Sequence, residues 1–475
     1  MKLSILTSVS ALALLTAAPA MAQPGGNTST VTQDGTNQLA NVQQTGAGDK
    51  STIDQQGTLH QSYITQRGGG NESDVEQDGN SNTALVDQTG DNDSEIVQNG
   101  FNNGASVVQN GDDNESTINQ VGNNNEVSTS NAAPWAGVDQ DGSRNSSAID
   151  QLGSAATANV FQSGDDNSSD IDQSNGAGGF ATVDQSGDRN ESSITQTALG
   201  ADASVLQTGD DNRSMILQNA ASTADVTQDG DNGVSEITQN DVGNTATLLQ
   251  SGLNNDNFIE QRAGATNGTV DVTQGGSGNA ARTIQVGGRL RNNTADGNSA
   301  TINQSGTNNF SGTAQEGSGN TAEINVSGNG VSVAGRQETA AGYRDNEPPE
   351  TDVWQISDNN KAYIDQASDA SRVTIYQGLE QPVQGVGNYN LAFGGNNYAD
   401  VTQNAGADNS RADVIQGGSD NIANVIQSGA DSVSYLNQFG SDNEATVTQT
   451  SDGNQSFITQ NGSSNSATVT QGPGL

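Results

Sequence analysis

The stretch that decides the fold is Ser214-Met215-Ile216-Leu217-Gln218, where a small residue, a β-branched residue and a glutamine stand at alternate positions. The same form returns at Ala224-Asp225-Val226-Thr227-Gln228 and at Ser235-Glu236-Ile237-Thr238-Gln239. Alternation with a period of two predicts a β-strand with one buried face. Because such glutamines recur about every 11 residues from Gln33 to Gln471, the sequence predicts a repeat architecture built from this strand.

Composition alone would predict a disordered chain and not a folded repeat. The 475 residues carry a formal charge of −41, only 30% are hydrophobic, 59 are glycine and none is cysteine. Such values are typical of disordered chains, but a fixed period carries more weight than composition and predicts one long solenoid. With 15 lysines and arginines against 56 acidic residues, nucleic acid is excluded as a partner. Without cysteine, disulfides contribute nothing to stability.

The N-terminus has the features of a signal peptide. Lys2 is followed by an apolar and small-residue core from Leu3 to Ala18, and Ala20-Met21-Ala22 fits a cleavage site. We therefore expect residues 1–22 to be removed, a mature chain that begins at Gln23, and an exported protein. No later run is apolar enough to predict a transmembrane segment.

Two kinds of strand alternate along the chain. One has the form Ser-x-Ile-x-Gln, as at Ser94/Ile96/Gln98, and the other has the form Ala-x-Val-x-Gln, as at Ala105/Val107/Gln109. The true repeat is therefore about 22 residues, or two strands. We predict an all-β, two-sheet β-solenoid (a cross-β stack) in which each kind of strand forms its own sheet. About 36 strands would make about 18 coils, for a stack on the order of 85 Å at about 4.8 Å per coil.

The corners between strands carry glycine, asparagine and aspartate. In Gln77-Asp78-Gly79-Asn80-Ser81-Asn82, Gly79 and Asn82 are the residues expected to tolerate positive φ. The other corner is acidic, as at Gly164-Asp165-Asp166-Asn167 and Gly209-Asp210-Asp211-Asn212, and would stack along one edge. These carboxylates could bind Ca²⁺, but the glycine-rich calcium nonapeptide is absent. A solvated, self-repelling edge is the preferred interpretation.

Several segments interrupt the repeat without changing the order of the two strand types. Between Gln120 and Gln140 the residues from Val121 to Trp135 are interpreted as an enlarged corner. We predict regular repeats over 23–261 and 401–475, separated by degenerate repeats with loop insertions over 262–400. The candidate loops in this middle region are Val286–Asn298, Gly328–Glu350 and Gly378–Tyr398.

Inward glutamine side chains can donate and accept along the stack axis, which offsets the cost of burying an amide. Asparagine and glutamine ladders of this kind also stabilise cross-β fibrils, and unpaired end strands template further strands. The candidate self-assembly residues are the ladder and core positions near the two ends. They are Gln33, Val42, Gln44, Ile53, Gln55, Gln77, Asn82, Gln88, Gln98, Asn103, Gln109, Gln438, Asn443, Gln449, Gln460, Asn465, Val469 and Gln471.

The string Gln77-x-Gly79-x-x-Asn82-x-Ala84-x-x-x-Gln88 resembles the curlin repeat, found in the subunits of curli, the extracellular amyloid fibres of Gram-negative biofilms. Further copies stand at Gln98/Gly100/Asn103/Ala105/Gln109, Gln438/Gly440/Asn443/Ala445/Gln449 and Gln460/Gly462/Asn465/Ala467/Gln471. The resemblance implies a strand–turn–strand cross-β unit and nucleated assembly outside the cell. It also implies partners: further copies of the chain, a nucleator subunit and an outer-membrane curli-type secretion pore.

The resulting hypothesis is a secreted structural subunit of curli-like fibres at the bacterial surface, with a role in biofilm matrix and adhesion. The alternative is a monomeric or surface-tethered β-solenoid adhesin that binds a partner through its loop insertions. An ice-binding solenoid is disfavoured because the outward residues before each glutamine, such as Thr32, Gln43 and Asp54, are mixed. No enzymatic activity, cofactor or metal is expected, since His60 is the only histidine and no catalytic constellation accompanies it.

Overall fold

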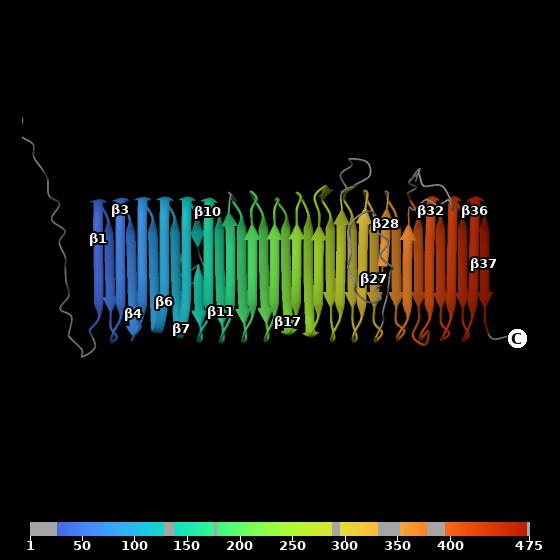
Figure 1. Cartoon of the computed structure of the whole chain (residues 1–475), viewed down its shortest axis with the longest axis horizontal. Coiled ribbons are helices and arrows are strands. Elements are labelled where there is room, and N and C mark those ends of the chain that lie inside the picture. Colours follow the sequence, from blue (N-terminus) through green and yellow to red (C-terminus); the bar gives the residue numbers. More distant parts are fainter. Residues whose placement is uncertain are drawn as a thin grey trace, which may run out of the picture.

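The computed structural model describes residues 26–127, 137–174, 178–286, 295–330, 352–356, 358–377 and 395–472. Within these residues the chain forms β-strands and turns and contains no helix. The strands lie side by side across one elongated body, with β1 (Thr28–Thr36) at one end and β37 (Ser466–Gln471) at the other (Figure 1). The predicted signal peptide, residues 1–22, lies outside the described residues.

The strands divide into two facing layers. Two long strands, β6 (Thr83–Phe101) and β7 (Gly104–Asn123), continue around a corner and contribute to both layers. Layer 1 contains most of the Ser-x-Ile-x-Gln strands, and layer 2 contains most of the Ala-x-Val-x-Gln strands. Ser62/Ile64/Gln66 in layer 2 and Ala412/Val414/Gln416 in layer 1 are exceptions.

Layer 1 consists of β1, β3 (Lys50–Thr58), β5 (Glu72–Asn80), the second halves of β6 and β7, β10 (Ser146–Ser154), β12 (Ser168–Ser174), β14 (Glu191–Gln196), β16 (Arg213–Gln218), β18 (Val234–Gln239), β20 (Asp256–Gln261), β23 (Ala280–Val286), β26 (Phe310–Glu316), β28 (Asp352–Ile356), β30 (Arg372–Gln377), β32 (Arg411–Ser419), β34 (Val433–Ser441) and β36 (Gln455–Ser463).

Layer 2 consists of β2 (Leu39–Gln44), β4 (Gln61–Gly68), the first halves of β6 and β7, β8 (Glu126–Val127), β9 (Val138–Asp141), β11 (Thr157–Ser163), β13 (Phe180–Ser186), β15 (Asp202–Thr208), β17 (Thr223–Asp231), β19 (Thr245–Leu253), β22 (Thr269–Gln274), β25 (Ser299–Gln304), β27 (Thr321–Val326), β29 (Lys361–Gln366), β31 (Tyr398–Gln403), β33 (Ile422–Gln427), β35 (Glu444–Gln449) and β37. The short strands β21 (Ala265–Thr266) and β24 (Ala295–Asp296) pair with each other at a corner.

Within each layer, a strand pairs in parallel with the strands one turn before and one turn after it. Through β14, β16 and β18, for example, Ile194 lies opposite Ile216, which lies opposite Ile237. The result is a parallel β-solenoid of about 17 turns with a repeat of about 22 residues, close to the 18 coils expected. The predicted fold class is therefore confirmed.

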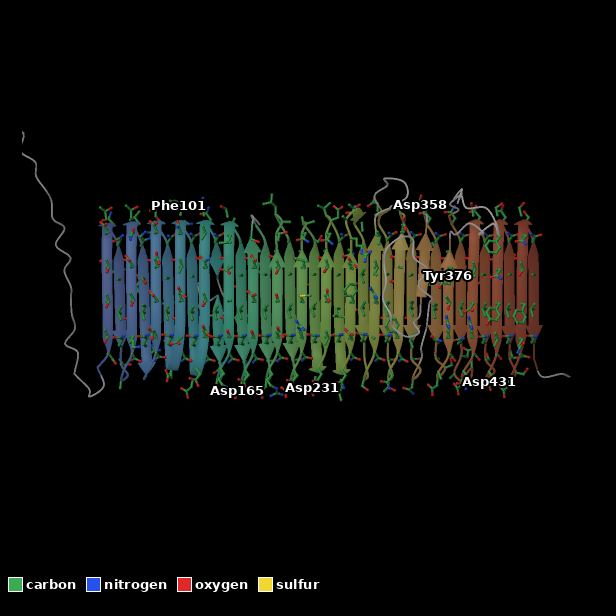
Figure 2. The ribbon with its side chains drawn as sticks, in the orientation of Figure 1. Phe101, Asp165, Asp231, Asp358, Tyr376 and Asp431 are labelled. Atoms are coloured by element: carbon green, nitrogen blue, oxygen red, sulfur yellow. The ribbon has the colours of Figure 1, made fainter. Side chains whose placement is uncertain are left out.

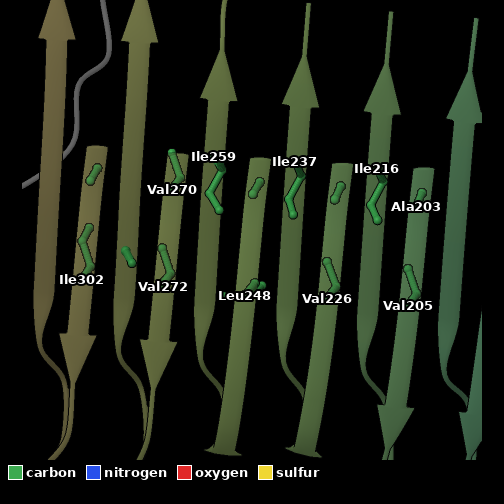
Figure 3. Packing of buried hydrophobic residues seen from close by; sticks show 14 of the residues in the cluster. Ala203, Val205, Ile216, Val226, Ile237, Leu248, Ile259, Val270, Val272 and Ile302 are labelled. Atoms are coloured by element: carbon green, nitrogen blue, oxygen red, sulfur yellow. The ribbon is translucent and has the colours of Figure 1, made fainter. Parts of the chain in front are cut away.

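The core lies between the two layers and runs along the whole stack. Figure 3 shows Ile216, Ile237 and Ile259 in one row and Val205, Val226 and Leu248 in the other, all at most 1% exposed. Burial of one such side chain contributes roughly 1.5–3 kcal/mol, whereas ordering a residue's backbone costs about 1–2 kcal/mol. A single turn is therefore unstable alone, and stability requires the stacked neighbours.

The insertion after Gln120 is not an enlarged corner, which corrects the prediction for Val121–Trp135. Glu126 and Val127 pair with β11, and the same rung resumes at Gly137, whose amide donates to Ser106 O at 3.1 Å. Residues 128–136 lie outside the described residues. On either side of them, Val127 and Val138 keep their register with Ala158 and Val160 of β11, so one rung of layer 2 is built from two segments.

The corner asparagines also differ from expectation. Positive φ falls on the residue before the inward asparagine, as at Ser81 (61°) and Asn102 (58°), while Asn82 and Asn103 are not among the positive-φ residues. The left-handed residue turns the chain so that the following asparagine points inward, where it is buried. The inward corner asparagine therefore contributes side-chain hydrogen bonds, whereas the preceding residue, which is itself asparagine at Asn102, supplies the left-handed conformation.

Most of the candidate loops Val286–Asn298, Gly328–Glu350 and Gly378–Tyr398 lies outside the described residues. On either side of these segments the strands keep their register: β23 pairs with β26, β27 with β29, and β29 with β31. A search of the described chain for a helix long and apolar enough to cross a membrane finds none.

Candidate functional site: amide ladders and open ends

The inward glutamines of layer 1 form one unbroken hydrogen-bonded ladder. Each side-chain amide nitrogen donates to the side-chain oxygen of the glutamine one turn further along, from Gln33 to Gln460, at 2.7–3.0 Å. From Gln55 onward these side chains are at most 6% exposed. The hydrogen bonds of the ladder offset the free-energy cost of desolvating a buried amide in every turn.

The glutamine ladder of layer 2 has a gap. It runs from Gln44 to Gln304 and again from Gln366 to Gln471. Between these runs, Val326 occupies the register position of a glutamine. The oxygen Gln366 Oε1 is buried without a hydrogen-bond partner as a result. Gln304 Nε2 donates instead to Ser311 Oγ at 2.9 Å and to Ala280 O at 3.0 Å.

Both ladders have one direction. In most of these glutamines the second N–H is used by a main-chain carbonyl, as in Gln77 Nε2 to Gln61 O at 3.1 Å. A carbonyl cannot pair with Oε1, so this bond orients the amide and leaves the oxygen facing the preceding turn. The N-terminal end therefore presents Oε1 of Gln33 and of Gln44 as acceptors, and no described group donates to either.

The corner asparagines form a second set of ladders that run in the opposite sense. The backbone amide of Asn103 donates to Asn82 Oδ1 at 3.0 Å. Near the C-terminal end, Asn465 N donates to Asn443 Oδ1 at 3.1 Å. Each asparagine therefore fixes the corner of the next turn, which stabilises the in-register stacking of the coils.

Glycine is required at the stacked corner position. Gly79 has a φ of 111°, and a Cβ added to it would lie 2.0 Å from Gly100 O. A Cβ added to Gly100 would likewise lie 1.9 Å from Gly122 O. A side chain here would separate adjacent turns, so the corner glycines set how closely the coils stack.

The two ends of the solenoid are open. In β1 every residue is exposed, and in β37 exposed and half-buried residues alternate, whereas β16 in the middle buries Ser214, Ile216 and Gln218. Figure 1 places these end strands at opposite extremes of the stack. Among the described residues no strand pairs with the outer edge of either end, so each end presents a row of backbone groups and inward side chains without a described neighbour on one side.

The acidic corners do stack along one edge, as predicted. Asp165, Asp231 and Asp431 lie at the edge opposite to Phe101 and Asp358 (Figure 2). Along this edge Asp165 N donates to Asp188 Oδ1, and Asp188 N donates to Asp210 Oδ1, both at 2.9 Å.

Two arginines interrupt this acidic edge. Arg144 bonds both carboxylate oxygens of Asp166, at 2.7 and 2.9 Å, and Arg189 pairs in the same way with Asp211. The arginine hydrogen bonds hold the pKa of Asp166 and of Asp211 below the ordinary value. Among the described residues, no group of three or more acidic, histidine or cysteine side chains is arranged to hold a metal ion.

Carboxylates on the outward faces of the layers have pKa values that are raised instead of lowered. Desolvation by the neighbouring strands raises the pKa of Asp170, and the charges of Asp150 and Asp172 raise it further. The same first cause raises the pKa of a set of outward aspartates, namely Asp74, Asp93, Asp139, Asp184 and Asp225. In-register stacking thus places like charges on adjacent rungs.

Each candidate self-assembly residue lies in one of these structures. Val42, Ile53 and Val469 face the core, the glutamines form the two ladders, and the asparagines form the corner ladders. Two features were missed by sequence reasoning: the gap at Val326 and the place of His60 in a corner ladder. Both could have been found by aligning the repeats in register, because each residue departs from the type that its position requires.

A stack of short strands that lie across its long axis, with amide ladders along that axis and open ends, defines a class of protein, the parallel β-solenoid with cross-β stacking. The model of the curlin associated repeat matches the chain at residues 51–79, 63–90, 91–122, 100–130, 180–209, 295–325 and 440–472. Multiple copies of the curlin associated repeat therefore occur along the chain. Comparison with curated proteins gives no match.

Proposed function

We propose that this chain is a structural subunit of extracellular curli-like amyloid fibres and that it assembles by end-to-end addition of strands. The observation that carries the proposal is the complementarity of its two open ends. The curlin associated repeats, whose family is structural and normally non-enzymatic, support the same conclusion.

The end strands match residue by residue in the register that relates one turn to the next. If a second copy continued the stack, its β1 would lie on β36 as β36 lies on β34. Small, aliphatic, glutamine and glycine positions would then each meet their own kind. The pairs are Ser456 with Ser29, Ile458 with Val31, Gln460 with Gln33, and Gly462 with Gly35 in layer 1, and Ala467 with Ala40, Val469 with Val42, and Gln471 with Gln44 in layer 2.

The hydrogen-bonding groups at the two ends are complementary as well. At the C-terminal end, Gln460 Nε2 and Gln471 Nε2 each donate one N–H to a carbonyl of their own chain, at 2.9 Å, and keep the other. At the N-terminal end, Gln33 and Gln44 present acceptors. A joint between copies would therefore extend both glutamine ladders without a buried unpaired amide.

The proposed setting is the outside of a Gram-negative cell, in biofilm matrix and surface adhesion. Support comes from the signal-like N-terminus and from the family, which suggests an extracellular fibre. A curli-type outer-membrane pore and a nucleator subunit are the partners that this setting would require.

The test is incubation of the purified chain with an amyloid dye, followed by electron microscopy, with and without preformed seeds. We expect a lag that seeds remove and fibres in which the strands lie across the long axis. A chain that stays monomeric at high concentration, even when seeded, would overturn the proposal and favour the monomeric adhesin.

A further inference from the structure

His60 occupies an asparagine position in a corner ladder. It lies between β3 and β4, directly after the left-handed residue Leu59 (φ 61°), as Asn82 follows Ser81 (φ 61°) one turn later. Its side chain is fully buried, with 0% exposure. It is also the only histidine of the chain, and the proposed assembly does not use it.

The imidazole reproduces both hydrogen bonds of an asparagine amide. His60 Nε2 lies 2.9 Å from Gln56 O, as Asn82 Nδ2 lies 2.9 Å from Asp78 O. His60 Nδ1 lies 3.3 Å from the backbone nitrogen of Asn82, as Asn82 Oδ1 lies 3.0 Å from that of Asn103. Because the Asn82 nitrogen is a donor, Nδ1 must be unprotonated and Nε2 must carry the hydrogen.

Histidine differs from asparagine in one respect that matters here. The acceptor Oδ1 of asparagine keeps its lone pairs at any physiological pH, whereas imidazole gains a second proton in mildly acidic solution. That proton would sit on Nδ1 and face the Asn82 N–H, so a buried hydrogen bond would become a contact between two donors.

Among the described residues of the neighbouring turns, no counter-charge compensates for this proton by a direct contact. Asp34 and Asp78 flank Gln56 in register, and neither bonds to His60. The other charged residues of the adjoining strands lie at outward-facing strand positions or beyond the far corner. They are Lys50, Asp54, Arg67, Glu72, Asp74 and Glu76.

The corner at His60 holds the first turn of the solenoid in place through main-chain hydrogen bonds. Leu39 N donates to His60 O at 2.8 Å, and Leu59 N donates to Thr36 O at 3.0 Å. The corresponding corner at the C-terminal end holds Asn443 and Asn465, which do not titrate. We propose that His60 makes the N-terminal end a pH-gated docking surface for a second copy of the chain, ordered at neutral pH and frayed in acid.

The fraying of the N-terminal turns in acid is measured on the monomer, so this proposal can be tested whether or not fibres form. The experiment is hydrogen–deuterium exchange with mass spectrometry on the wild type and on His60→Asn, which restores the residue type of the ladder. At about pH 8 the peptides covering 28–66 should exchange at the same rate in the wild type and in His60→Asn. At about pH 5 these peptides should exchange about tenfold faster in the wild type than in His60→Asn. Peptides covering 433–471 should not differ at either pH.

Equal exchange of the two proteins at the acidic pH would overturn the proposal. So would the same difference at both pH values, because it would indicate a purely structural role. A second measurement uses the single histidine as its own probe: nitrogen NMR of labelled histidine should report the Nε2–H tautomer at neutral pH. An Nδ1–H tautomer there would contradict the geometry.

Fibre growth links the inference to the proposed function. Seeded elongation of the wild type should slow in acid, and that of His60→Asn should slow less. Absence of fibres for both proteins at every pH would refute the proposed function and leave the exchange result to decide the role of His60.

Discussion

At the scale of single residues, this protein depends on side chains that can both donate and accept. A buried glutamine in each layer of each turn is tolerated because its amide is fully used, with one N–H along the stack and one to the main chain. Val326 is the exception, and it leaves Gln366 Oε1 unpaired. The departure identifies a specific weak rung in the stack.

The exchange Val326→Gln should therefore stabilise the chain. Its amide would donate to the unpaired Gln366 Oε1, and its oxygen would accept from Gln304 Nε2 in exchange for the bond of that nitrogen to Ser311 Oγ. The net gain is one hydrogen bond, which contributes about 1 kcal/mol. Every neighbouring rung of layer 2 already holds a glutamine at this position, so the side chain fits. The free energy of unfolding in urea, followed by circular dichroism, measures the gain.

Val326→Met is the matched control for that exchange, since methionine has similar length and no amide. We expect it to be close to the wild type or less stable. A glutamine variant that is no more stable than the methionine variant would show that the missing hydrogen bonds are not what weakens this rung.

At the scale of elements, the end strands have one paired edge and one free edge. In β1, Thr28 N donates to Asp49 O at 2.8 Å. Because successive residues of a strand direct their N–H groups to opposite sides, Ser29 N–H points away from β3. The free edge of β1 can therefore be altered without loss of a hydrogen bond inside the monomer.

Ser29→Pro removes one donor from that free edge and should block addition of another copy there. Proline is tolerated on edge strands whose N–H faces solvent, so the thermal unfolding temperature of the monomer should be nearly unchanged. Seeded elongation, followed by dye fluorescence, should fall severalfold relative to Ser29→Ala, which keeps the N–H. Equal elongation of the two variants would mean that β1 is not a joining strand.

At the scale of the whole molecule, the net charge of −41 opposes folding and association, and the in-register stack concentrates it. Outward aspartates such as Asp170 have a raised pKa, so the folded state holds their protons more tightly than the unfolded state does. Their contribution is unfavourable at neutral pH. It is relieved as the pH falls through the raised pKa towards the ordinary value of 3.8.

Asp170→Asn should accordingly raise the thermal unfolding temperature at pH 7, and the difference should vanish below about pH 3.8. Asp211→Asn is the control of opposite sign, because Arg189 lowers the pKa of Asp211 and that pairing is lost on acidification. It should lower the unfolding temperature slightly at pH 7 and not at low pH. Differential scanning calorimetry at both pH values measures these shifts, and a destabilised Asp170→Asn would refute the account.

The strands, their two types, the period of about 22 residues and the facing sheets could all be predicted from the sequence. This was possible because a two-residue alternation and a strict phase are properties of the chain alone. The acidic edge also followed from the repeat, since equivalent residues of successive turns must stack.

The contacts between repeats of successive turns, in contrast, could be read from the three-dimensional structure alone. The direction of the glutamine ladders depends on carbonyls contributed by the facing layer, as Gln61 O orients Gln77. The inward turn of Asn82, the strand interrupted after Val127 and the hydrogen-bonded tautomer of His60 likewise depend on contacts between turns. Such contacts join residues far apart in sequence, and the spacing of residues along the chain does not specify which donor meets which acceptor.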